Sequence, residues 1–182
     1  MHADLHDPTG ADLAGLARWQ ASVEGLAPDL APLVEAKARA AVESDLVARA
    51  VRSGALHREL LVAAPRRAIT GDASATRESH DAELVEGFVD LCFDEDDGLV
   101  VVDYKTDDVP SDAAVQAALA RYAPQGAAYA LLLEAATGRT VTEVHFLFLR
   151  GTEAVDAAVD DLESEKARVR EQLAVRAGEG AA

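Results

Sequence analysis

Two apolar runs joined by a short acidic segment do most to constrain how this chain of 182 residues can fold. Residues 83–93 and 99–106 are rich in valine, leucine and phenylalanine, and the sequence DEDDG connects them. Runs of this length, bounded by turn residues, are typical of β-strands, and the short connection predicts an antiparallel hairpin. Gly98 is available for a positive φ angle at its end. The hairpin decides which polar side chains face one another.

The other segments alternate between helix-like and strand-like patterns, which predicts an α/β fold whose mixed sheet has one antiparallel hairpin and one crossover. Residues 1–55 are interpreted as a helical lead-in packed on a core formed by residues 56–182, with Trp19 in the helical core. The elements expected around the hairpin are helices within 11–54, including one over 33–50, a strand over 57–64, a polar turn-rich segment over 65–81, a helix over 113–136 kinked or restarted at Pro124, a strand over 141–150 and a helix over 153–175.

The second apolar run ends in an unusual way, with an acid and a base one residue apart. Side chains alternate between the two faces of a strand, so Asp103 and Lys105 share a face. On the preceding strand, Asp90 is expected to share a face with Phe88 and Cys92. The alternation predicts that charged groups from both strands gather at one end of the hairpin.

The register of the hairpin determines how close the acids come. If Phe93 pairs with Val100, Asp90 lies opposite Asp103, and directly opposed residues are about 4.5–5.5 Å apart at Cβ. Two bare carboxylates at that distance repel each other. A divalent cation between them reverses the sign, and Mg²⁺ is commonly bound by one or two carboxylates together with water and phosphate oxygens. A lysine beside such an ion suits metal-assisted hydrolysis of a phosphodiester.

A simpler interpretation of Asp103 and Lys105 is a solvated ion pair at a strand end, worth about 0–1 kcal/mol. The lysine content argues against it. The chain has three lysines, Lys37, Lys105 and Lys166, and arginine supplies most of its positive charge. A lysine at this position is therefore less expected by chance, and lysine changes its pKa on burial more readily than arginine.

Three segments together resemble the RecB-like nucleases of the PD-(D/E)xK superfamily, in particular the nuclease domains fused to AddA- and AdnB-type bacterial helicases. They are GFVD at 87–90, DYKT at 103–106 and QGAAY at 125–129, in the order and at the spacing of that family's motifs. The resemblance covers about residues 58–150. It implies a restriction-endonuclease-like core, a mixed sheet flanked by helices, with an N-terminal helical extension.

The resemblance also implies a role for each matching residue. Two carboxylates and one main-chain carbonyl would hold Mg²⁺ or Mn²⁺, a lysine would be catalytic, and a glutamine and a tyrosine on one helix face would brace the site or touch the substrate. These residues are Asp90, Asp103, the Tyr104 carbonyl, Lys105, Gln125 and Tyr129. Glu59 matches a glutamate on the first strand of the family, and a surface glutamate is the alternative.

The sequence departs from the family at one metal ligand. The family has a histidine on a helix near the start of the domain, whereas here His2 and His6 lie near the beginning without helical context. We expect the helix that carries this histidine to be cut away or to lie upstream. Pro124 directly precedes the QGAAY motif and is expected to shift the helix that carries it.

The other ionisable or reactive residues carry no catalytic prediction. His57 and His80 are isolated, and His145 is expected to pack or point outward. Cys92 has no cysteine partner, so neither a zinc site nor an activated thiol is supported. The acidic run 94–97 is interpreted as a solvated hairpin tip rather than a Ca²⁺ site.

The charge bears on how a substrate is reached. Seventeen basic residues against 33 acidic ones give a net charge of −16, which argues against a chain that binds nucleic acid unaided. Together with this charge, the resemblance implies a deoxyribonuclease module, an exonuclease, to which a helicase motor delivers single-stranded DNA during double-strand break repair. The alternatives are a catalytically degenerate module with a structural or partner-binding role and a stand-alone repair nuclease. The sequence shows neither a membrane span nor a secretory signal, so a cytoplasmic location is expected.

Overall fold

The apolar runs of the sequence form the centre of a five-stranded sheet in the computed structural model, which describes residues 12–71 and 83–179. The strand order is β1-β2-β3-β4-β5. β3 and β4 are parallel, and the other neighbours are antiparallel. The strands are β1 (Leu56–Pro65), β2 (Leu84–Glu95), β3 (Gly98–Lys105), β4 (Val141–Arg150) and β5 (Glu153–Ala158). The predicted α/β architecture with one hairpin and one crossover is confirmed.

The hairpin of β2 and β3 has the predicted register, because Phe93 pairs with Val100. The turn consists of Asp96 and Asp97 alone. Gly98 opens β3 in close contact with the chain before β4, where a Cβ atom would lie 2.6 Å from the carbonyl oxygen of Thr140. Glycine at this position thus lets the hairpin pack against the neighbouring loop.

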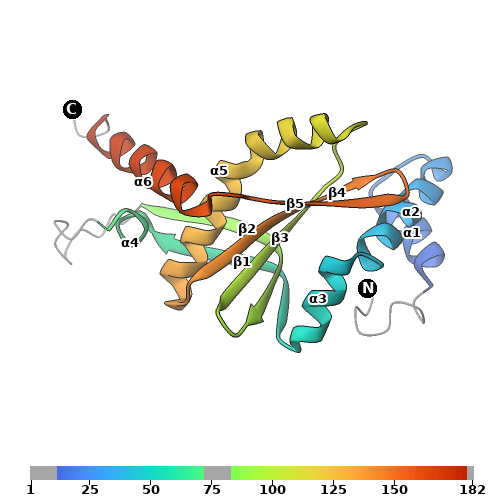
Figure 1. Ribbon diagram of the computed structural model, residues 1–182. Helices are drawn as coiled ribbons and strands as arrows, with labels where there is room; N and C mark the ends of the chain where they lie inside the picture. The colour runs from blue at the N-terminus through green and yellow to red at the C-terminus, as the bar shows by residue number, and fades with distance from the viewer. Residues whose placement is uncertain (1–11, 72–82, 180–182) are drawn as a thin grey trace.

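Helices cover both faces of the sheet (Figure 1). They are α1 (Leu13–Val23), η1 (Pro28–Leu30), α2 (Ala31–Val42), α3 (Asp45–Ser53), α4 (Arg66–Thr70), α5 (Asp112–Thr137) and α6 (Leu162–Glu179). α5 packs on one face, where Val101, Val144 and Phe146 form a core with it. On the other face the α3 residues Leu46 and Val47 pack against strand side chains that include Phe93 and Val102.

α5 is the long crossover between the parallel strands, and its ends are defined by side chains. The hydroxyl of Ser111 accepts a hydrogen bond from the Ala114 N–H, and Gly138 ends the helix with a φ of 71°. Pro124 lies inside the helix, as predicted, and Figure 1 shows α5 bending partway along its length. The bend agrees with the loss of one helical hydrogen bond at proline.

Three predictions about the helical segments are wrong. The helix expected over 153–175 begins only at Leu162, because 153–158 turns back as β5 after Gly151, whose φ is 60°. The helix expected over 33–50 is divided in two, since the hydroxyl of Ser44 caps the first turn of α3. Trp19 is 49% exposed and does not form a helical core. The buried residues of α1 are Leu13, Ala17 and Ala21.

The alternation of side chains along β1 and β2 is interrupted at Glu59 and Asp90, so that residues on one face before this point continue on the other face after it. Before this line, Leu56 of β1 packs with the α3 core, whereas beyond it Leu60 and Val62 pack with the α5 core. Glu59 has a φ of 50°, the one positive value among the described residues other than glycine. That conformation is strained for a side-chain-bearing residue and rotates the strand.

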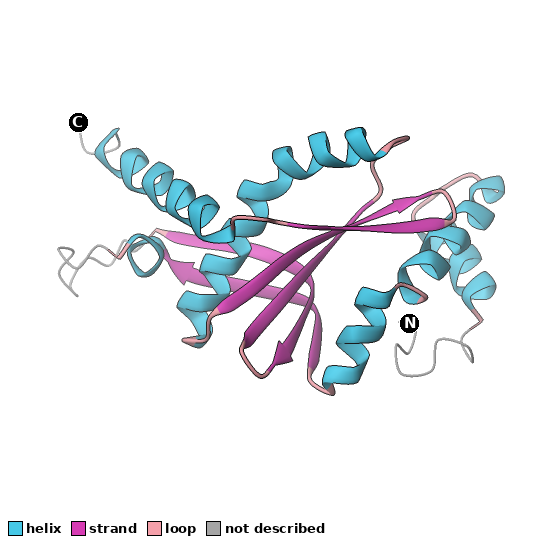
Figure 2. Cartoon of the chain, in the orientation of Figure 1, coloured by secondary structure: helices cyan, strands magenta, loops and turns pink. Residues whose placement is uncertain are grey.

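The same exchange corrects one prediction of strand geometry. Phe88 and Cys92 do not share a face, because Cys92 is buried in the α5 core and Phe88 is 62% exposed. Here β2 also stops pairing with β3. The last pair between them is Leu91 with Val102, and beyond it β2 pairs with β1 alone. Figure 2 shows β1 and β2 running on together, away from the other strands. The result is a fork between β2 and β3.

Candidate functional site

Asp90 lies at the base of the fork, where β2 leaves β3. Its carboxylate accepts a hydrogen bond from the main-chain N–H of Tyr104 over 2.9 Å. This side chain takes the place of the strand partner that the N–H loses when the two strands separate. The last pair of the hairpin, Leu91 with Val102, is directly adjacent to Asp90 and Asp103, so the two acids stand at the point where the strands separate and not within the paired ladder.

Asp103 is a buried acid with a basic neighbour. Its carboxylate is 2.9 Å from the ammonium nitrogen of Lys105, and the residue is 5% exposed. Burial raises the pKa of Asp103, the Lys105 ammonium opposes this effect, and the charge of Asp90 adds to the increase. The Asp103 carboxylate therefore lies close enough to Asp90 for that charge to disfavour its ionised form.

Lys105 is held on three further sides. Its ammonium donates to the side-chain oxygen of Gln125 over 3.0 Å. It also lies over the ring of Tyr122, 4.2 Å from the centroid, and 5.5 Å from that of Phe146. Contacts between a cation and aromatic faces are favourable when the site excludes water. A long flexible side chain is thus fixed in one position.

α5 supplies the support for this lysine through the predicted pair of Gln125 and Tyr129. The amide nitrogen of Gln125 donates to the Tyr129 hydroxyl over 2.9 Å, as residues four apart on a helix can. The Tyr129 ring packs so closely on β2 that a Cβ atom on Gly87 would lie 2.9 Å from it. Gly87, the first residue of the GFVD segment, therefore allows the bracing helix to approach the sheet.

Glu59 lies opposite Asp90 by register, between the pairs formed by Arg58 with Leu91 and Leu60 with Val89. It is exposed and lines the same pocket as Asp90. Glu59 lies on the first strand, as predicted, while its role in the site stays a prediction, since its exposure also fits a surface glutamate. Its strained backbone conformation had no sequence signal.

Two features near the site were missed by sequence reasoning. The Tyr122 hydroxyl donates to Asp107 at 2.9 Å, and Arg121 contacts the same carboxylate at 2.6 Å. Lys37 of α2 donates to the main-chain oxygen of Leu149 over 2.8 Å. The spacing of Tyr122 and Gln125 along α5 was the available signal, because residues three apart share a helix face.

The donor set can be compared with what different metals require. Asp90, Asp103 and main-chain carbonyls offer oxygen atoms, which suit Mg²⁺ or Mn²⁺ rather than Zn²⁺. Within residues 12–71 and 83–179, no group of three or more His, Cys, Asp or Glu side chains could hold a metal. Two carboxylates and a main-chain carbonyl have the chemistry of a site for an ion that takes its other ligands from water or substrate oxygens. His2 and His6 lie outside the described residues.

The side chains of His145 and Cys92 are both buried. The imidazole of His145 is buried between the carboxylates of Glu143 and Asp156, each 2.8 Å away. Burial raises the pKa of the Cys92 thiol to about 11, which makes it a poor nucleophile. Both observations agree with the prediction that neither residue is catalytic.

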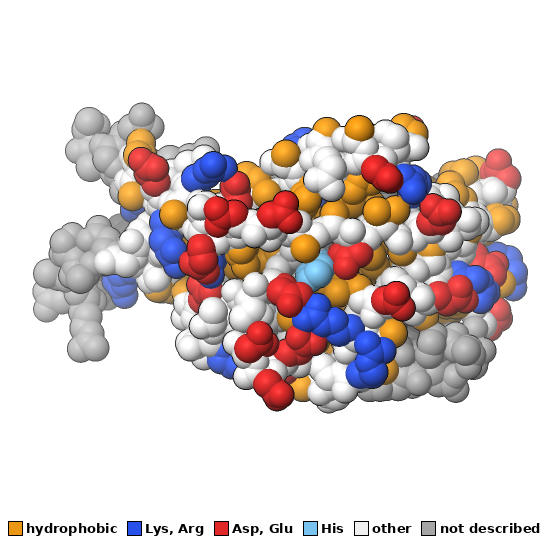
Figure 3. Space-filling model, viewed as in Figure 1, with side chains coloured by type: hydrophobic (Ala, Val, Ile, Leu, Met, Phe, Trp, Pro, Cys, Tyr) orange, Lys and Arg blue, Asp and Glu red, His pale blue; other side chains and the backbone are white. Residues whose placement is uncertain are grey.

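The surface gives no sign of a broad cationic track on the face that Figure 3 views. Acidic side chains alternate there with arginine and lysine side chains. Several of these basic groups are already paired, as Arg49 is with Glu95 and Glu143 at 2.5 and 2.6 Å. None of the described helices is apolar over the length that a bilayer requires.

The chain is similar in sequence to known proteins. A sequence model described as the PD-(D/E)XK nuclease superfamily matches residues 4–181. The A subunit of an ATP-dependent helicase/nuclease from Moorella thermoacetica is 33% identical over 159 residues, 83% of this chain and 11% of its own length. The proteins of the same name from Acetivibrio thermocellus and Desulforudis audaxviator are 35% identical over 130 residues and 48% identical over 75 residues.

The matched regions are small parts of these relatives. The alignments cover 69% and 40% of this chain but 10% and 6% of the Acetivibrio and Desulforudis proteins. This chain thus spans about a tenth of the length of the curated relatives that it matches over most of its own length. A solved structure titled "Crystal structure of SSO0001" aligns with a TM-score of 0.40 and 13% identity over 90% of this chain and 71% of that one.

Proposed function

We propose, from the premise that this chain belongs to the PD-(D/E)XK nuclease superfamily, that it is a metal-dependent deoxyribonuclease module. The observation that carries the proposal is the fork, where Asp90 is fixed by the Tyr104 N–H beside the buried ion pair of Asp103 and Lys105. Residues 56–182 would form the nuclease core, and residues 1–55 a helical lead-in packed on it.

The carboxylates are the proposed metal ligands. Asp90, Asp103 and the Tyr104 carbonyl would hold Mg²⁺ or Mn²⁺, and Glu59 would support the same centre from β1. The pKa of Asp103 is raised mainly by burial and further by the charge of Asp90, and a bound cation would offset both effects, which supports this role. A bound divalent ion would offset the charge of the phosphate and activate water for attack.

Lys105 would act as the catalytic amine. Fixed by Asp103, Gln125 and the Tyr122 ring, its ammonium would stabilise the charge that builds on the phosphate oxygens during hydrolysis. A water oxygen forms a bond to phosphorus, and the bond from phosphorus to one sugar oxygen breaks. The sugar oxygen takes up a proton, which leaves a terminal phosphate and a hydroxyl.

The charge of the chain supports a substrate supplied by another component. A net charge of −16 gives little affinity for phosphates at a distance from the site. The relatives are named as parts of helicase/nucleases, and this chain matches a small part of their length. We therefore place it with a helicase motor that delivers single-stranded DNA for end processing in repair.

The test combines metal binding with cleavage. Calorimetric titration with Mn²⁺ should show binding by the parent chain and by Asp160→Asn, an exposed control, and no binding by Asp103→Asn. Cleavage of labelled single-stranded DNA should fall by about 100-fold or more in Lys105→Ala. Equal Mn²⁺ heats in all three proteins, or no cleavage by the parent, would favour a degenerate module.

Linear and circular single strands separate the modes of cleavage. An exonuclease needs an end, so we expect linear DNA to be degraded with Mg²⁺ or Mn²⁺ and circular DNA to persist. Cleavage of the circle at the same rate would exclude the proposed exonuclease mode while leaving the hydrolytic site in place.

A further inference from the structure

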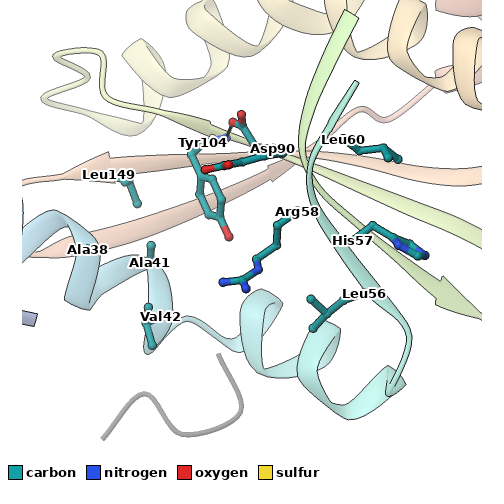
Figure 4. Close-up of a pocket in the computed structure, with 11 residues that line it drawn as sticks. Ala38, Ala41, Val42, Leu56, His57, Arg58, Leu60, Asp90, Tyr104 and Leu149 are labelled. Atoms are coloured by element: carbon teal, nitrogen blue, oxygen red, sulfur yellow. Dashed lines mark hydrogen bonds between the residues drawn. The ribbon is translucent and has the colours of Figure 1, made fainter. Parts of the chain in front are cut away.

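A pocket of about 860 Å³ lies between α2, the start of β1 and the end of β3 (Figure 4). Its wall on the helical side is apolar and small, with Ala38 and Ala41 of α2. Leu149 of β4 and Leu56 of β1 continue the apolar lining. Pockets of about 300–1,000 Å³ commonly hold small molecules or parts of larger ligands.

The pocket adjoins the proposed catalytic carboxylates. Asp90 and Glu59 are among its lining residues, so one side of the pocket is the base of the fork. Tyr104 lines it as well, and because side chains alternate along β3, its ring lies on the opposite face of the strand from Asp103 and Lys105. A group bound here would therefore lie next to Asp90 and Glu59, on the side of the fork away from Lys105.

The side chains that enter the pocket suit a planar ligand. Figure 4 shows the Tyr104 ring and the Arg58 side chain directed into the same space, opposite the α2 wall. Aromatic rings and guanidinium groups both stack on the faces of nucleobases. The lining also includes the carboxylates of Asp90 and Glu59, so stacking rather than net charge favours a nucleobase here.

We propose that this pocket receives the base and sugar of the nucleotide adjoining the phosphate held at Asp90 and Asp103. The inference rests on the proposed nuclease function and gives it a physical source of strand selectivity. A base inside a duplex is paired and stacked, and it must leave the stack to enter a pocket. Single strands and unpaired ends enter without that cost, so the pocket favours them.

The experiment measures base placement separately from cleavage. The probe is a single-stranded oligonucleotide with a terminal 2-aminopurine, whose fluorescence falls when it stacks on an aromatic ring. It is titrated with Mg²⁺ into the full chain carrying Lys105→Ala, which removes turnover. Ala38→Phe fills the pocket, and Ala136→Phe makes the same change at an exposed position at the end of α5.

We expect quenching in the Lys105→Ala chain and with Ala136→Phe, and affinity about tenfold weaker with Ala38→Phe. Tyr104→Leu should abolish quenching, and Tyr104→Phe should restore it, which keeps the test valid if Ala38→Phe folds poorly. A blunt duplex with the same terminal base should quench less. Equal affinity and quenching in all variants would overturn the proposal and leave the pocket to a protein segment.

The outcomes distinguish this inference from the nuclease function. If the chain with intact Lys105 cleaves DNA and Ala38→Phe neither weakens binding nor changes quenching, the pocket assignment fails and the hydrolytic site stands. If no chain cleaves DNA but quenching depends on Ala38 and Tyr104 as expected, the pocket binds single strands and the hydrolytic assignment fails.

Discussion

Asp90 accepts a hydrogen bond from the main-chain N–H of Tyr104 at the point where β2 and β3 stop pairing. The carboxylate thus completes the hydrogen bonding of the fork and faces the proposed metal position at the same time. These two roles place different demands on the side chain, because an amide oxygen can accept the hydrogen bond but provides no charge for a cation.

Substitution of Asp90 should separate stability from metal binding. Asp90→Asn keeps an acceptor for the Tyr104 N–H, so the free energy of unfolding should change little, while Mn²⁺ binding is lost. Asp90→Ala leaves the N–H without its partner and should cost about 1–3 kcal/mol as well. Urea unfolding and calorimetry check both results, and equal destabilisation by the two variants would contradict the structural role.

Gly87→Ala should reduce activity through α5. The new methyl group would lie 2.9 Å from the Tyr129 ring, and displacement of that ring moves Gln125 away from Lys105. Overpacking of this kind costs about 1–3 kcal/mol of stability. The rate of DNA cleavage should fall by more than the lost stability explains, as measured well below the unfolding temperature.

Gly138→Ala is the matched control for this substitution. Gly138 has a φ of 71°, and a methyl group added there would meet no described atom within 4 Å, so its cost is backbone strain of about 1 kcal/mol. Cleavage by Gly138→Ala should remain at the parent rate. An equal loss of activity in both variants would show that general destabilisation is the cause.

Lys166 should be important for stability and not for catalysis. It is 2% exposed and forms ion pairs with Glu134, at 2.7 Å, and with Glu163. Lys166→Met leaves Glu134 without its principal partner and should lower the free energy of unfolding by about 3 kcal/mol. Arg168→Met, which removes an exposed partner of Glu165, should cost less than about 1 kcal/mol. Chemical denaturation distinguishes the two.

The stability of the chain should decrease as the pH rises past the range in which His145 ionises. The carboxylates of Asp156 and Glu143 outweigh burial and raise the pKa of His145 above its ordinary value of 6.5. A group with a raised folded pKa stabilises fully below its unfolded pKa and loses that contribution as the pH passes the folded pKa. Unfolding curves from about pH 6 upward should show the decrease, and His145→Gln should flatten it.

Glu143, which faces His145, should affect the stability of the chain at acidic pH. Arg49 holds Glu143 from α3 and is the principal reason that the pKa of Glu143 falls to about 2. A depressed pKa gives stability that is present above the ordinary value of the group and is lost as the pH falls toward about 2. Arg49→Met should therefore move acid unfolding to higher pH, and an unchanged acid midpoint would contradict this linkage.

The sequence predicted local relationships well. The hairpin followed from two apolar runs and a turn, and the register considered for it, Phe93 with Val100, is the one observed as far as the pair of Leu91 with Val102. The contact of Gln125 with Tyr129 followed from helical spacing. Both depend on residues whose relative positions are fixed by the geometry of one helix or one hairpin.

Relationships between distant elements were not readable from the sequence. β5 is a short strand of alanine, valine and acids, a composition that also suits the first turn of a helix, and only pairing with β4 decides its state. The exchange of faces near Glu59 depends on one φ angle. The Tyr122 contact with Asp107 depends on where α5 docks.

Because the alternation of side chains is interrupted at Glu59, the helices on the two faces of the sheet contact different parts of the candidate site. Lys105 is hydrogen-bonded to Gln125 of α5, whereas Asp90 lines the pocket formed by α2 and the start of β1. A substitution in α2 that fills the pocket would therefore act first on the side of the site formed by Asp90 and Glu59, and one in α5 on the side formed by Lys105.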